Sequence, residues 1–130
     1  MFNRKVAIAK IEPERRIVYG WAYVTKNAAG MDVVDYSGEF TTTEEIERAA
    51  ERFMEDSRIG GAFHKHRAGY AVHSIVVTDD VADALNIVSK QRGWFIGMRI
   101  EDDEAWEKVK SGEYAAFSIG GSADMEVIDG

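Results

Sequence analysis

The sequence contains no cysteine, and this absence removes several kinds of chemistry at once. A chain without cysteine has no disulfide framework, no thiolate nucleophile and no cysteine zinc site. The fold must therefore rest on the chain's own core, and a reducing compartment is compatible with it. The cytoplasm is the default expectation.

Proline and long apolar runs are also scarce. The single proline, together with the lack of low-complexity stretches, argues against long disordered linkers. The amino terminus carries two basic residues but no apolar run like that of a signal peptide, and nowhere do about 18 apolar residues occur together. The sequence therefore predicts neither export nor a membrane helix.

Clusters of basic residues are missing as well. The formal net charge is −7, and basic pairs such as Arg15-Arg16 stand alone. Nonspecific binding to nucleic acid depends on clustered Lys and Arg that release counterions. We therefore expect no nucleic-acid partner.

The residues that are present predict one domain over residues 1–130, since this length and a 45% hydrophobic content suffice for a core. Alternating apolar residues predict strands over 2–11, 15–25, 62–66, 70–78, 93–100, 114–119 and 123–128. Helical spacing predicts helices from Thr42 to about Asp56, from a cap at Asp79-Asp80 to Val88, and from Asp102 or Asp103 to Gly112. This order predicts an α+β fold, a mostly antiparallel sheet curled toward a β-barrel with about three surrounding helices.

Ser118 is the first candidate for chemistry. It closes a strand of aromatic and small residues and is followed by Ile119 and the pair Gly120-Gly121. Glycines after a serine allow backbone amides to turn toward its hydroxyl, as an oxyanion hole requires. The alternative is that this serine only begins a turn.

All three histidines, His64, His66 and His73, fall within ten positions. A serine nucleophile needs a base, and only these residues can supply an imidazole. The alternatives are a solvated side chain for His66, beside two basic neighbours, and a core histidine for His73. A metal-dependent hydrolase built on the three is a further hypothesis, but no Asp or Glu lies between Phe63 and Thr78 to support it.

Three stretches occur in the order and spacing of a known family: Tyr19–Thr25, Asp56–His64 and Val109–Gly121. Val33–Glu39 resembles that family's acidic turn. Together they resemble the phage prohead, or capsid-maturation, serine proteases of the XkdF-like type. The resemblance covers about residues 15–121, and its core is Lys-x-Gly-x5-Ser-Ile-Gly.

The resemblance implies a protease related to the herpesvirus assemblins, with a β-barrel that carries serine and histidine on its strands. By position, it implies Ser118 as the nucleophile and His64, after Gly-Gly-x-x, as the general base. His66 is an extra histidine that the pattern does not require. Backbone amides at Ile119, Gly120 and Gly121 would hold the oxyanion.

The third catalytic residue in this wider group is a His or an acid on the strand after the serine. Asp124 and Glu126 are the acids there, and Glu126 is our candidate to orient His64. Family members usually continue into an acidic, apolar segment that ends near a Pro-Ala pair, whereas this sequence stops at Gly130. A trimmed domain, a Ser-His dyad and an inactive relative all remain open.

The function implied is that of a serine endopeptidase that processes scaffold and capsid proteins during phage prohead maturation. The expected partners are the phage scaffold and major capsid proteins, and the expected place is the cytoplasm of the bacterial host, inside the assembling prohead. The resemblance implies no cofactor and no metal, and it leads us to expect a homodimer. The alternative is a non-catalytic capsid-assembly or scaffold-binding module with the same barrel.

Overall fold

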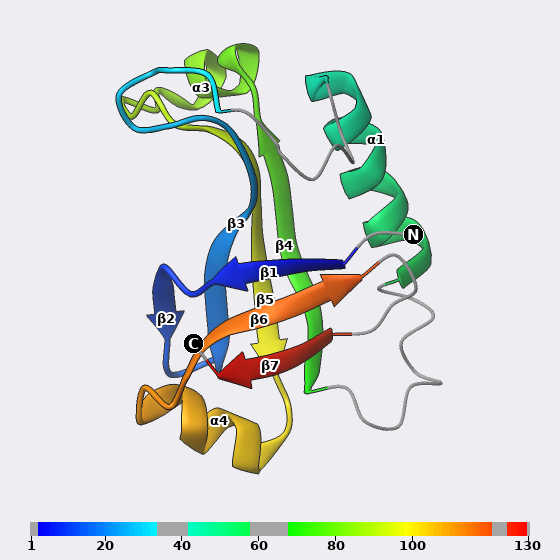
Figure 1. Cartoon of the computed structure of the whole chain (residues 1–130), viewed down its shortest axis with the longest axis vertical. Helices are drawn as coiled ribbons and strands as arrows, with labels where there is room; N and C mark the ends of the chain where they lie inside the picture. The colour runs from blue at the N-terminus through cyan, green and yellow to red at the C-terminus, as the bar shows by residue number, and fades with distance from the viewer. Residues whose placement is uncertain (1–2, 34–41, 58–67, 121–124, 130) are drawn as a thin grey trace.

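The computed structural model describes residues 3–33, 42–57, 68–120 and 125–129. Its strands form two antiparallel sheets, which cross one another in Figure 1. The first has the order β1-β6-β7 and the second the order β2-β3-β5-β4. The strands are β1 (Asn3–Ala7), β2 (Lys10–Glu12), β3 (Ile17–Lys26), β4 (Gly69–Val77), β5 (Arg92–Ile100), β6 (Tyr114–Gly120) and β7 (Met125–Asp129).

The α+β class and its three α-helices are confirmed, but the predicted barrel is not found, because neither sheet closes among the described residues. The departure from a barrel begins in the predicted strand over 2–11, which is divided into β1 and β2. The amide of Ile8 donates to Ala115 of one sheet, and the amide of Ala9 donates to Tyr19 of the other. The bend at these residues sends β1 to β6, while β2 forms the predicted hairpin with β3.

Gly20 allows the two sheets to approach at this crossing. A Cβ at Gly20 would overlap the carbonyl oxygen of Ala7 and would lie 2.6 Å from Cγ1 of Val6. Only a residue without a side chain leaves room for the backbone of β1 there. A single atom would therefore disturb the crossing of β1 over β3.

The core lies between the two sheets. Every second side chain of β5 is buried on one face, as the alternation predicts. β6 supplies Phe117 and Ile119 to the same cluster, both with no exposed surface. The β5 residues of this cluster are Trp94, Ile96, Met98 and Ile100.

Helix α1 (Thr43–Arg52) begins at the predicted cap, where the hydroxyl of Thr42 accepts a hydrogen bond from the Glu45 amide at 3.1 Å. The chain then continues as a π-helical turn, η1 (Phe53–Ser57), so the helical stretch reaches the predicted end. Phe53 is buried and meets the Trp94 ring edge-on at 5.6 Å. This contact fixes the helix against the face of the sheet that carries the core.

Helix α3 (Asp79–Leu85) is capped by Thr78, not by the predicted Asp79-Asp80, and it ends at Asn86 with φ 57°, before Val88. Helix α4 (Asp103–Lys110) is capped by Asp102, one of the two residues, Asp102 and Asp103, that were predicted to begin it. Within the described part of the chain, no helix is long and apolar enough to cross a membrane.

Candidate active site

Ser118 lies on β6, the central strand of the three-stranded sheet. Both of its neighbours in sequence, Phe117 and Ile119, are fully buried in the core. Because side chains alternate along a strand, Ser118 points to the opposite face, where it is half-buried. The hydroxyl is therefore held on a rigid strand without being enclosed by the core.

The strand pairing gives Ser118 two direct neighbours. Lys5 of β1 lies opposite it on one side, and Glu126 of β7 lies opposite it on the other. Directly opposed residues of an antiparallel pair have Cα atoms about 4.5 to 5.5 Å apart. The register thus brings the predicted nucleophile and the predicted third residue onto adjacent strands at the same level.

The sequence around Lys5 does not predict a site residue, because nothing in its local pattern distinguishes it from other lysines. Its side chain is exposed. Lysines that act as general bases are desolvated by burial. Lys5 lacks that burial, so we do not assign it the role of the base.

His64, the predicted base, and His66 lie outside the described residues, as does Gly121. The role of His64 and the oxyanion role of Ile119, Gly120 and Gly121 therefore remain predictions. Gly120 is the last residue of β6 and is paired with Asn3 of β1. The predicted oxyanion segment begins where this strand ends.

His73 is described, and it is exposed, so the interpretation as a core histidine is wrong. It lies opposite Gly97, and its ring stacks on Tyr19 with centroids 5.8 Å apart and an interplanar angle of 14°. Both partners are on the face of the four-stranded sheet that points away from the core. Ser118 points away from the core on the other sheet. The side chains of His73 and Ser118 therefore lie on opposite sides of the core and cannot share a proton.

Among residues whose side chains are described, no group of three His, Asp or Glu could hold a metal ion. Two of the three histidines are outside these residues, so the hypothesis of a three-histidine metal site is not tested.

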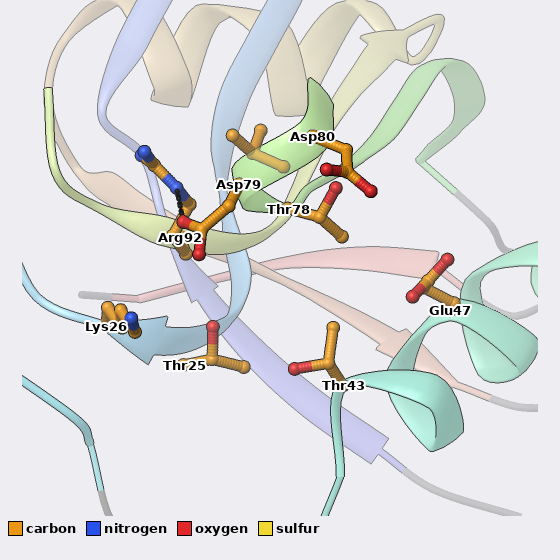
Figure 2. A pocket seen from close by; sticks show the side chains of 9 residues that line it. Thr25, Lys26, Thr43, Glu47, Thr78, Asp79, Asp80 and Arg92 are labelled. Atoms are coloured by element: carbon orange, nitrogen blue, oxygen red, sulfur yellow. Dashed lines mark hydrogen bonds and ion pairs between the residues drawn. The ribbon is translucent and has the colours of Figure 1, made fainter. Parts of the chain in front are cut away.

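A polar cavity of about 480 Å³ lies elsewhere, between the start of α1 and the start of α3 (Figure 2). Arg92 on its wall donates to Asp79 at 2.9 Å and also to the backbone carbonyls of Ser89 and Gln91. These hydrogen bonds fix the position of the Arg92 guanidinium. Local sequence patterns do not predict this cavity, because its wall combines residues from five elements, β3, α1, β4, α3 and β5. The lining residues are Thr25, Lys26, Thr43, Glu47, Val77, Thr78, Asp79, Asp80 and Arg92.

The chain is similar in sequence to one protein family and to two bacterial proteins. Residues 5–127 match a family model described as "Putative phage serine protease XkdF". The chain is 33% identical over 128 residues to the phage-like element PBSX protein XkdF of Bacillus subtilis (strain 168), covering 95% of this chain and 44% of that protein. It is 32% identical over 126 residues to the uncharacterized protein YqbD of the same strain, covering 95% of this chain and 37% of YqbD.

The chain thus spans less than half the length of these relatives. No solved structure matches it. The match to the family model extends over nearly the whole chain and includes Ser118 and part of each strand that flanks it. The chain therefore belongs to the XkdF family of phage proteins, the family described as "Putative phage serine protease XkdF".

Proposed function

We propose that this chain is a serine endopeptidase that cleaves scaffold and capsid proteins during phage prohead maturation. Ser118 is the nucleophile, His64 the general base and Glu126 the residue that orients His64. One observation carries the proposal: Ser118 occupies the central strand between two fully buried neighbours, directly opposite Glu126. The description of the family supports the same class of reaction.

The chemistry follows from these roles. His64 accepts the proton of the Ser118 hydroxyl as its oxygen attacks the carbonyl carbon of the scissile peptide bond. Backbone amides near Gly120 stabilise the oxyanion of the tetrahedral intermediate. His64 then gives the proton to the leaving amine, and the acyl group remains on Ser118. Water, activated by the same imidazole, releases the acid and regenerates the hydroxyl.

The position of Ser118 on the central strand β6 suits such a reaction. A nucleophile on a central strand is held by hydrogen bonds from two neighbours, and buried residues on both sides limit its movement. The half-buried face keeps a path open to a peptide. We further propose that the partners are phage scaffold and major capsid proteins, met in the host cytoplasm inside the assembling prohead.

A fluorophosphonate probe tests the proposal directly, because it reacts with activated serines and can be located by intact-protein and peptide mass spectrometry. We expect one label per chain on Ser118 and none in Ser118→Ala. Ser89→Ala is the matched control, since Ser89 is exposed and lies on a loop far along the chain from β6. It should be labelled as the unaltered chain is.

The rival function is that of a capsid-assembly or scaffold-binding module that does not cut. A folded chain that takes no label at Ser118, but still associates with scaffold protein, would favour this module and overturn the protease proposal.

A further inference from the structure

The polar cavity between the starts of α1 and α3 takes no part in the proposed reaction (Figure 2). None of its lining residues belongs to the sheet that carries Ser118. Its volume of about 480 Å³ falls within the range of clefts that bind small molecules, about 300 to 1,000 Å³. Val77 is the only apolar residue that lines it, so the ligand that fills it is polar.

Two cations stand together at one end of the cavity. Lys26 of β3 lies directly opposite Arg92 of β5 in the strand register, so both side chains leave the sheet on the same face. Asp79 neutralises Arg92, with 2.9 Å between Nε and Oδ1. Lys26 is half-buried, and no described carboxylate forms an ion pair with it. Asp32, which forms an isolated β-bridge with Lys26, is exposed. This end therefore keeps one positive charge that no described side chain pairs.

Two carboxylates stand at the other end. Glu47 comes four residues after Thr43 on α1, so both side chains share the helix face that lines the cavity. Asp80 lines the cavity from the first turn of α3. In Figure 2, the two carboxylates lie on the side of the cavity away from the two cations. Glu47 is half-buried and Asp80 is exposed, and no described cation forms an ion pair with either.

Hydroxyl groups complete the polar wall. Thr25 and Thr43 lie between the basic and the acidic side in Figure 2, and Thr78 lines the cavity from the cap of α3. The Thr78 hydroxyl accepts a hydrogen bond from the Val81 amide at 3.2 Å and keeps its own hydrogen to donate. Hydroxyls both donate and accept, so they match the N–H and C=O groups of a peptide bond.

The separation of charge decides the class of ligand. Glu47 and Asp80 repel a ligand with only anionic groups, and Lys26 repels a ligand with only ammonium groups. We propose that this cavity binds a small zwitterion, an amino acid or short peptide with both termini free. Its carboxylate lies against Lys26, and its ammonium group lies against Glu47 and Asp80. Each contact is a charge-assisted hydrogen bond, the stronger kind.

The probes are alanine, dialanine and trialanine, which place the two charges at increasing separation. Each is titrated into the isotope-labelled full chain, and binding is followed by NMR. The amides of Thr43 and Thr78, at the two helix starts, should shift. The tightest of the three is then compared with its N-acetyl and C-terminal amide forms, which each lack one charge. Each blocked form should bind at least about tenfold more weakly.

Lys26→Met tests the basic end. In this variant the C-terminal amide should bind as tightly as the free peptide, because the partner of the carboxylate is gone, while N-acetylation should still weaken binding. Lys10→Met is the matched control, since Lys10 is exposed and outside the cavity. It loses the same charge and should keep both effects of blocking.

The double variant Glu47→Gln, Asp80→Asn tests the acidic end. N-acetylation of the peptide should no longer weaken binding to it, while amidation still should. The matched control carries Glu101→Gln and Glu113→Gln, two exposed residues outside the cavity, and should behave as the unaltered chain does. These ratios compare two ligands on one variant, so a general loss of stability does not imitate them.

Ser118→Ala should bind the peptides normally, so failure of this proposal can be told apart from failure of the protease proposal. Loss of binding in Ser118→Ala would place the peptides at the proposed active site and would overturn the cavity proposal. It is overturned as well if the blocked forms bind as tightly as the free peptide, if Lys26→Met and Lys10→Met change binding equally, or if none of the three probes binds. Circular dichroism confirms that each variant is folded before affinities are compared.

Discussion

Ser118 on β6 and Glu126 on β7 lie directly opposite one another in an antiparallel register, eight positions apart in the sequence. The register is confirmed along the strand, since Phe117 lies opposite Val127 and Ile119 opposite Met125. If Glu126 orients the imidazole that deprotonates Ser118, the negative charge of Glu126 is needed, and a neutral side chain of the same size cannot replace it.

Glu126→Gln should therefore lower the rate of fluorophosphonate labelling at Ser118 by at least about tenfold, while the fold is kept. The side-chain shape is nearly unchanged and only the charge is lost. Glu113→Gln is the control. Glu113 is exposed and directly precedes β6, and this variant should be labelled at the normal rate. An unchanged rate in Glu126→Gln would remove Glu126 from the site.

Comparing His64→Ala with His73→Ala tests which of these two histidines acts as the general base. The first should slow labelling by about 10²- to 10⁴-fold, the usual contribution of a general base. The second should leave the rate unchanged, because His73 stacks on Tyr19 on the far side of the core. The rate of fluorophosphonate labelling at Ser118 is measured around neutral pH for both variants and for the unaltered chain. A large loss in His73→Ala with a normal rate in His64→Ala would contradict the assignment.

Gly20→Ala should destabilise the fold by about 1 to 3 kcal/mol or more, because the added carbon meets the backbone of Ala7. Equilibrium unfolding in urea measures the change. Gly112→Ala is a useful control, since Gly112 has φ 85° but has open space where a Cβ would lie. It should cost about 1 kcal/mol through backbone strain alone. A smaller loss for Gly20→Ala than for Gly112→Ala would show that the crossing is not tight.

Lys108 of α4 links the helix to the strand of Ser118. Its Nζ lies 3.4 Å from the hydroxyl of Tyr114 and 5.2 Å from the centre of that ring. The Tyr114 hydroxyl, followed by the charge of Glu104, raises the pKa of Lys108 above its ordinary value of 10.5. A raised pKa in the folded state means that the contribution of Lys108 to stability is complete below pH 10.5 and is lost as pH rises through the raised value.

Lys108→Met should therefore lower the melting temperature at neutral pH, and the difference from the unaltered chain should shrink above about pH 10.5. In a Tyr114→Phe background the same substitution should have a smaller effect, because the main cause of the shift is gone. Thermal melts over a pH series provide the data. A difference that grows with alkaline pH would contradict the sign of this coupling.

Local rules predicted much of this fold. Glu45, one turn after Thr42, predicts the cap at Thr42, and Asp102 is one of the two residues predicted to begin the third helix. A cap can be predicted locally because it involves only neighbouring amides. The buried side of β5 followed from simple alternation. The cap of α3 was misplaced by one position because Thr78 and the two aspartates after it are all good caps.

The position of β1 could not be predicted in the same way. Its alternation fits a strand in either sheet, and its partner, β6, lies more than a hundred residues away along the chain. The exposure of His73 depends on which face of β4 packs on the core, and the bulge between Ala71 and His73 changes that register.

The sequence by itself determined the family, the acidic net charge, most of the helices and strands and the choice of Ser118 as the candidate nucleophile. Only the tertiary structure decided that the described strands form two sheets, that Ser118 lies opposite Glu126 in the strand register and that His73 lies on the far side of the core from Ser118. The physical reason is that caps and periodicity act within a few residues. Pairing between distant strands depends on contacts that form only when the whole chain is packed.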